Sequence, residues 1–148
     1  MSWKVKKFEE LTASELYEVL RLRSEVFVVE QDCVYQDLDG YDQKSIHVWK
    51  EEEGKAVACT RVLPKGVYYT EASIGRVIVA ASHRGGNLGR DLMRRSEEVL
   101  YSLGYEGSVK IMAQSYLLSW YQSQGYISEG EEFLEDGIPH KIMVKPTL

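Results

Sequence analysis

Apolar residues recur with two different spacings along this chain, and the spacing separates its strands from its helices. Alternating positions and short apolar runs predict strands, whereas apolar positions three or four residues apart predict helices. The pattern predicts strands over residues 3–8, 45–50, 55–63, 73–80, 109–113 and 140–145, helices over 13–29, 88–103 and 117–124, and an acidic loop over 32–44. A run of strands followed by alternating helices and strands indicates an α/β fold, a mixed sheet with helices on both faces.

The first predicted helix has a well-marked start. Thr12 and Glu15 have the spacing of a capping box, in which each side chain bonds the backbone N–H of the other residue. Leu16, Leu20 and Phe27 follow at helical positions, so we expect them to share the inner face of this helix.

Composition narrows the class of protein. The chain has 148 residues, 44% of them hydrophobic and 28% charged, which is typical of one globular domain over residues 1–148. No apolar run approaches ~18 residues, so we expect no membrane contact. A net charge of −5 argues against nonspecific binding of nucleic acid. Cys33 and Cys59 show neither metal-ligand spacing nor a disulfide framework, which favours a cytoplasmic location, and the three scattered histidines predict no metal site.

Residues 74–93 contain a candidate anion site. An apolar strand runs into the Gly85-Gly86 turn, and this turn opens an amphipathic helix. Free backbone N–H groups and the positive end of a helix then meet at one point, as an anionic phosphate requires. No Gly-Lys-Ser/Thr follows and the Gly-x-Gly-x-x-Gly spacing is absent, so the segment is neither a P-loop nor a dinucleotide fingerprint. A plain strand-to-helix turn is the alternative interpretation.

The same segment resembles the acyl-CoA pyrophosphate loop of the GNAT N-acetyltransferases, whose pattern is Gln/Arg-x-x-Gly-x-Gly/Ala. Arg84 and Gly89 fit this pattern, and Asn87 stands in the first glycine slot, where a side chain crowds the phosphate approach unless its backbone is left-handed. A later segment of the family resembles residues 114–126, in which Tyr121 and Gly125 match.

Longer blocks are similar to the ElaA subfamily of GNAT proteins. They cover residues 22–42, 74–79 and 135–140, and together they span nearly the whole chain. The resemblance implies a mixed α/β sheet whose central strands splay apart to admit the pantetheine arm of acetyl-CoA, the co-substrate.

The predicted cofactor site follows from the glycine turn and from the strand before it. Amides of residues 85–90 are expected to hold the pyrophosphate, and backbone groups of residues 77–79 to bond the pantetheine and polarise the thioester. Tyr121 is the predicted general acid that protonates the leaving thiol, with simple aromatic packing as the alternative. The predicted cofactor-binding residues are Val77, Ile78, Val79, Arg84, Gly85, Gly86, Asn87, Leu88, Gly89, Arg90 and Gln114.

The residues predicted to bind the acceptor are charged residues, several of them in otherwise apolar stretches of the sequence. Arg23 interrupts the apolar stripe of the first helix, so it is expected either to pair with Glu30 or to contact the acceptor. Asp37 and Asp42 are expected mainly to cap turns, and His47 and His140 are candidates to relay a proton. The predicted substrate-binding residues are Arg23, Glu30, Asp39, His47, Arg61 and Arg76.

Taken together, the sequence predicts a GNAT acyltransferase that moves acetyl from acetyl-CoA to an amine of a small molecule or peptide. Two alternatives stay open. One is an enzyme similar to the acyl-homoserine-lactone synthases, which share an Arg-x-x-x-Phe and Asp-x-x-Asp pattern. The other is a non-enzymatic module that binds acyl-CoA. Glu30, His47 and water are the candidates for the general base, and a homodimer is consistent with the sequence.

Overall fold

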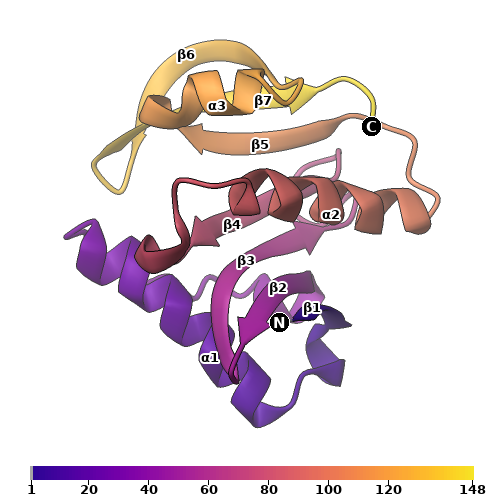
Figure 1. Ribbon diagram of the computed structural model, residues 1–148. Coiled ribbons are helices and arrows are strands. Elements are labelled where there is room, and N and C mark those ends of the chain that lie inside the picture. Colours follow the sequence, from indigo (N-terminus) through magenta and orange to yellow (C-terminus); the bar gives the residue numbers. More distant parts are fainter. Residues whose placement is uncertain (1) are drawn as a thin grey trace.

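The computed structural model describes residues 2–148, and Met1, the first residue of the predicted domain, lies outside the described residues. The strands are β1 (Ser2–Lys7), β2 (Ile46–Glu52), β3 (Lys55–Leu63), β4 (Ser73–Val79), β5 (Val109–Gln114), β6 (Ile127–Glu135) and β7 (Ile138–Lys145). The α-helices are α1 (Ala13–Arg23), α2 (Leu88–Ser102) and α3 (Leu118–Gln122), and α1 continues into a π-helical segment, Ser24–Glu30. The predicted mixed α/β fold is confirmed (Figure 1).

The strands form two antiparallel sheets that meet at one point. One sheet has the order β1-β2-β3-β4, and the other has the order β5-β7-β6. Within residues 2–148 one parallel bridge joins them, Ala72 to Val109, where the N–H of Lys110 donates to the carbonyl of Ala72 at 2.9 Å. Beyond this bridge β4 and β5 no longer pair, so each leaves an edge free toward the space between them (Figure 1).

Helices cover both faces of the first sheet, as the sequence predicts. On one face, buried residues of α1 and of the π-helical segment pack against Trp49, Cys59 and Ile78. On the other face, α2 packs Leu92 and Met93 into a larger core that continues into the second sheet. Burying one such side chain fully contributes ~1.5–3 kcal/mol, so these two clusters hold the first sheet rigid beneath the splay.

The start of α1 is confirmed, but its predicted inner face is wrong. The Thr12 N–H donates to Glu15 at 2.9 Å, and the Glu15 N–H donates to Thr12 Oγ1 at 3.1 Å, which completes the capping box. The buried stripe is Glu15, Val19, Leu22 and Val26, whereas Leu16, Leu20 and Phe27 are only half-buried. The helix is therefore rotated by about one residue from the expected orientation, and Phe27 reaches the space between the sheets instead.

Strand β6 is missing from the sequence prediction. It lies at the edge of its sheet, pairs with β7 alone and is exposed along most of its length, so it needs no apolar pattern. A turn signal does mark it. Asp136 and Gly137 have φ of 52° and 75°, the left-handed pair that an Asp-Gly hairpin turn adopts.

Candidate active site

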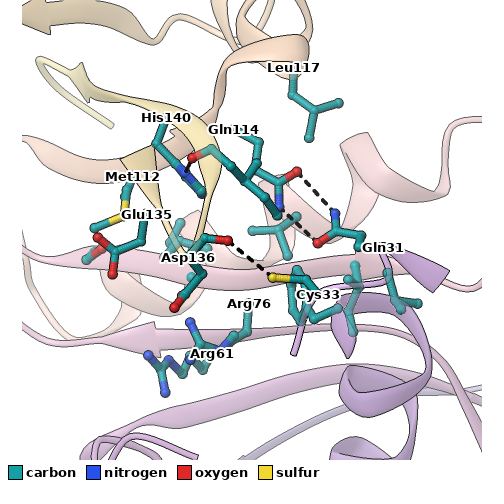
Figure 2. Close-up of a pocket in the computed structure, with 18 of the residues that line it drawn as sticks. Gln31, Cys33, Arg61, Arg76, Met112, Gln114, Leu117, Glu135, Asp136 and His140 are labelled. Atoms are coloured by element: carbon teal, nitrogen blue, oxygen red, sulfur yellow. Dashed lines mark hydrogen bonds between the residues drawn. The ribbon is translucent and has the colours of Figure 1, made fainter. Parts of the chain in front are cut away.

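A cavity of about 830 Å³ fills the splay between β4 and β5. Its wall includes the free edge of β4, the end of β5 with α3, the segment after α1, and the tip of the β6–β7 hairpin (Figure 2). Strand β3 and the loop between β3 and β4 complete it. A cavity of this size is typical of small-molecule sites.

A β-bulge shapes the β4 side of the cavity. Cys59 pairs with Ile78 and Arg61 pairs with Gly75, so β4 carries one more residue than β3 over this stretch. Arg76, within the bulge, has φ of 50°, an uncommon value for a residue with a side chain. The bulge bends β4, and Val77, Ile78 and Val79 follow it along the cavity wall.

The turn between β4 and α2 leaves backbone donors free. Among residues 2–148, no backbone carbonyl accepts a hydrogen bond from the N–H groups of residues 85–90, and Asn87, the N-cap of α2, makes no side-chain cap. Gly85 carries the left-handed conformation, with φ of 92°. Asn87 does not take the left-handed conformation, because its φ is −97°. The unpartnered donors and the helix dipole together suit an anion.

Gly89 is required for packing. A Cβ at this position would lie 2.9 Å from Cζ2 of Trp120 and 3.7 Å from a methyl of Val79. The absence of a side chain therefore lets α2 approach α3 and β4 closely. Gly86 differs, because a Cβ there would meet nothing within 4 Å.

Arg84 bridges the turn to the segment after α1. Its Nε donates to the carbonyl of Val79 at 2.9 Å, and its two terminal nitrogens bond Glu30 at 2.6 and 3.1 Å. Arg90, in the first turn of α2, is exposed and makes no ion pair with any residue of the described chain. Of the two arginines predicted for phosphate contact, Arg90 is free and Arg84 is already paired.

Tyr121 lines the cavity from α3. Its side chain is 6% exposed, and its ring meets the edges of Trp120 and Tyr126 at centroid distances of 4.9 and 5.9 Å. Burial raises the pKa of the Tyr121 phenol, with a smaller contribution from Tyr116. The hydroxyl therefore stays protonated across the neutral range, as a proton donor must.

Residues 30–33, which we call the strap, cross the open side of the splay. Besides the ion pair of Glu30, the amides of Gln31 and Gln114 bond each other at 3.1 and 3.4 Å. Cys33 donates from Sγ to the carbonyl of Asp136 at 3.4 Å (Figure 2). The strap thus ties together the glycine turn, the end of β5 and the β6–β7 hairpin.

Beneath the strap lies an ionic network of three arginines and three aspartates. Arg23, 1% exposed, bonds Asp42 at 2.7 Å and Asp37 at 2.9 Å. The predicted pairing of Arg23 with Glu30 is therefore wrong, and Asp37 and Asp42 serve as ion-pair partners rather than turn caps. Sequence spacing suggested Glu30, but the loop after the π-helical segment folds back and brings Asp37 and Asp42 to the guanidinium.

The cavity side of the network is formed by Arg61, Arg76 and Asp39. Arg61 bonds Asp39 at 2.5 Å, and Arg76 donates from Nε to Asp37 at 2.7 Å. Burial raises the pKa of Asp39, but the hydrogen bonds from Arg61 and the Tyr41 N–H, together with the charges of Arg61 and Arg76, outweigh burial and lower the pKa to about 2. Asp39 is therefore an anion with its charge already satisfied.

His47 lies in the core of the network and outside the cavity wall. It is 1% exposed, and its Nε2 is 2.9 Å from the carbonyl of Asp42. Burial lowers its pKa, so the ring is neutral. The structure therefore does not bring His47 or Arg23 to the cavity, and both act within the folded scaffold.

Comparison with known proteins decides the family. The family described as "Acetyltransferase (GNAT) domain" matches residues 9–146. The chain belongs to the GNAT acetyltransferase family.

Individual relatives of this GNAT chain agree. It is 39% identical to Protein ElaA of Escherichia coli, over 100% of this chain and 98% of that protein. The crystal structure of ElaA superposes with a TM-score of 0.91, covering 98% of this chain and 99% of ElaA, at 38% identity. The crystal structure of an acyl-CoA N-acyltransferase from Pseudomonas aeruginosa also superposes with a TM-score of 0.91, at 35% identity, covering 98% of this chain and 99% of that protein. The acyl-homoserine lactone synthase BjaI, solved with SAM and isopentyl-CoA, shares the fold with a TM-score of 0.73 at 19% identity. The match covers 92% of this chain and 78% of BjaI.

Most of the residues predicted for the site meet at this GNAT cavity. The predicted residues in its wall are Glu30, Asp39, Arg61, Arg76, Val77, Ile78, Val79, Arg84, Gly89, Gln114 and Tyr121. Gly85, Gly86, Asn87, Leu88 and Arg90 belong to the adjoining turn and first turn of α2.

Two carboxylates of the β6–β7 hairpin and five tyrosines of the wall were not predicted from the sequence. Glu135 and Asp136 come from the hairpin, beside His140, which the sequence did offer as a proton relay, and the tyrosines are Tyr35, Tyr41, Tyr68, Tyr69 and Tyr116. The hairpin could have been found from its Asp-Gly turn, whereas nothing in the sequence places the tyrosines. In the part of the chain that the structure describes, no three His, Cys, Asp or Glu side chains group as metal ligands, and no helix is long and apolar enough to cross a membrane.

Proposed function

We propose that this GNAT protein transfers an acetyl group from acetyl-CoA to an amine. The observation that carries the proposal is the cavity of the splay, which has free N–H donors of the α2 N-terminus beside one end and the protonated hydroxyl of Tyr121 in its wall. The printed description of the Pseudomonas aeruginosa relative, an acyl-CoA N-acyltransferase, supports the same class of reaction.

The donor would lie along β4. The N–H groups of residues 85–90 would hold the pyrophosphate, with the exposed cation of Arg90 nearby. The free edge of β4 at residues 77–79 would bond the amides of the pantetheine arm, as another strand would, and an N–H there would polarise the thioester oxygen. This placement leaves the far side of the cavity for the acceptor.

The reaction forms one C–N bond and breaks one C–S bond. A neutral amine attacks the thioester carbon, the amine nitrogen loses a proton, and the departing sulfur takes the proton of the Tyr121 hydroxyl. A free thiol has a pKa of about 8.5 and a phenol about 10, so this transfer is uphill in water. Inside the cavity burial raises the basicity of the sulfur and also the pKa of Tyr121, so these two effects oppose each other, and the hydroxyl assists by protonating the sulfur as the C–S bond breaks.

Carboxylates on the acceptor side favour an amine. Glu135 and Asp136 line the cavity and form no ion pair with any residue between 2 and 148, so their negative charge is available to an ammonium group. The unpaired cysteines Cys33 and Cys59 support a reducing compartment such as the cytoplasm.

The test is turnover. Purified protein is incubated with acetyl-CoA and a panel of amines (aliphatic diamines, amino acids, peptides with free N-termini), and CoA release is followed with a thiol reagent. We expect CoA release that depends on an amine. An acyl carrier with a long chain in place of acetyl-CoA tests the synthase alternative, and binding without release would identify a non-enzymatic module.

Tyr121→Phe tests the proposed acid. The ring and its packing remain, but the proton donor is lost, so kcat should fall by ~10²–10⁴-fold with little change in KM for acetyl-CoA. Unchanged kcat, under conditions where the chemical step limits the rate, would assign the proton to another group.

A further inference from the structure

The β6–β7 hairpin contributes the histidine of the cavity wall, His140, which the sequence offered as a candidate to relay a proton. Glu135, Asp136 and His140 all come from within three residues of its Asp-Gly turn and all line the cavity (Figure 2). His140 lies opposite Gln114 of β5 and Phe133 of β6 in the strand register, so the sheet fixes its position from both sides.

The ring of His140 is held in one tautomer. Its Nδ1 lies 2.6 Å from the carbonyl oxygen of Ile138. A carbonyl can only accept, so Nδ1 carries a hydrogen, and in the neutral form of the ring the lone pair lies on Nε2. The ring also stacks on Phe133, with centroids 6.1 Å apart and planes at 23°, which restricts its rotation.

We propose that His140 is the general base that takes the proton of the acceptor amine, through Nε2. This assignment rests on the proposed acetyl transfer. An ammonium group entering the cavity loses one proton to Nε2, and the resulting lone pair on nitrogen forms the C–N bond. The C–S bond breaks as the Tyr121 hydroxyl protonates the sulfur. The proton that the new amide nitrogen sheds restores the tyrosine, and imidazolium releases its proton to solvent, so charge and atoms balance.

The other bases near the cavity are already engaged. Glu30 is held by both terminal nitrogens of Arg84, and Asp39 is held by Arg61 with its pKa lowered to about 2. His47 lies outside the cavity wall with its Nε2 bonded to a backbone carbonyl.

Glu135 and Asp136 remain as carboxylates beside His140, and their role would be to attract the ammonium. The titratable and charged groups that share the cavity wall with His140 are Glu30, Cys33, Tyr35, Asp39, Tyr41, Arg61, Tyr68, Tyr69, Arg76, Arg84, Tyr116, Tyr121, Glu135 and Asp136.

His140→Asn is the sharpest variant for a test. Its side-chain amide can still donate to the carbonyl of Ile138, but no group replaces Nε2. With acetyl-CoA and the fastest amine of the panel, we expect kcat/KM for the amine to fall by ~10²–10⁴-fold at neutral pH. The loss should shrink as pH rises toward the pKa of the amine, because solvent then supplies the neutral nucleophile. Added imidazole should restore part of the rate in His140→Gly.

Two controls distinguish the loss of a general base from a loss of folding and from a change in the net charge of the hairpin. The melting temperature and the affinity for acetyl-CoA of His140→Asn should match those of the wild type. Glu131→Gln removes an exposed carboxylate of β6 that lies outside the cavity wall and should leave kcat/KM unchanged.

Wild-type kcat/KM in His140→Asn would overturn the role of His140 and leave acetyl transfer standing. So would a loss that stays constant with pH and is not relieved by imidazole. A wild-type enzyme that releases no CoA with any amine of the panel would overturn acetyl transfer, and the base with it.

Discussion

The ionic network under the strap and the glycine turn before α2 are both polar regions, but the polar groups of the network are paired and those of the turn are not. In the network, Arg23, 1% exposed, finds both Asp37 and Asp42 within 2.9 Å. In the turn, the N–H groups of residues 85–90 find no backbone acceptor within residues 2–148.

The difference separates scaffold from site. A buried charge without partners costs several kcal/mol, so each charge of the network is paired, and the pairs fix the loop over residues 37–42 against the sheet. Donors left free at a helix terminus cost little while water covers them, and they can exchange that water for an anion. Paired charges therefore indicate a structural role, and unpartnered donors indicate a ligand.

The largest effect should come from breaking the network. Asp42 bonds Arg23 at 2.7 Å and Arg61 at 3.1 Å, and Asp42→Ala leaves both guanidinium groups buried without this carboxylate. We expect the free energy of unfolding to fall by ~3–5 kcal/mol, measured by urea denaturation. Glu25→Ala, which removes the exposed partner of Arg21, is the control and should cost less than about 1 kcal/mol. Equal losses in the two variants would refute the distinction.

The pH dependence of stability should report the same network. The pKa of Asp39 is about 2 in the folded protein, below about 3.9 in the unfolded chain, so the folded state binds fewer protons. Its stabilisation, about 2 kcal/mol, is present above about pH 4 and is lost as pH falls toward 2. The difference in unfolding free energy between wild type and Asp39→Asn should therefore shrink over this range. A difference that is constant from pH 6 to pH 2 would show that Asp39 has no such shift.

A charge placed in the glycine turn should affect binding rather than folding. A side chain at Gly86 meets no neighbour within 4 Å, so Gly86→Glu adds a carboxylate beside the proposed pyrophosphate site without a clash. Repulsion should weaken acetyl-CoA binding by at least about tenfold, or about 1.4 kcal/mol, measured by calorimetry. Gly86→Ala should bind within about twofold of the wild type. If Gly86→Glu binds acetyl-CoA as tightly as the wild type, the pyrophosphate does not bind at this turn.

The smallest effect concerns Arg84, which stands between the two regions. It is paired like a network residue, but its side chain is 42% exposed and that of Glu30 is 39% exposed. Such a pair contributes ~0–1 kcal/mol to stability. Glu30→Gln removes a carboxylate next to the proposed anion site, so acetyl-CoA should bind about two- to fivefold more tightly, or by up to ~1 kcal/mol. Weaker binding would mean that the pair itself orders the turn.

The sequence by itself determined the elements that carry a local signal. The capping box of Thr12 and Glu15 marked the start of α1, and the glycine turn with its amphipathic helix marked the free N-terminus of α2, because neighbouring residues make these local structures. Tyr121 and residues 77–79 came from the resemblance to the GNAT family, and all line the cavity.

Only the tertiary structure decided which charges meet. Arg23 is 14 residues from Asp37 and 19 from Asp42 in the chain, and the sequence offers nearer carboxylates such as Glu30. The sequence around a carboxylate does not indicate which cation it will pair with, so the fold of the loop after α1 determines the partner of Arg23. The same holds for His140, whose place in the cavity depends on β6, an exposed edge strand without an apolar pattern. Local periodicity records which face of an element is buried, whereas partners far apart in the chain are set by packing.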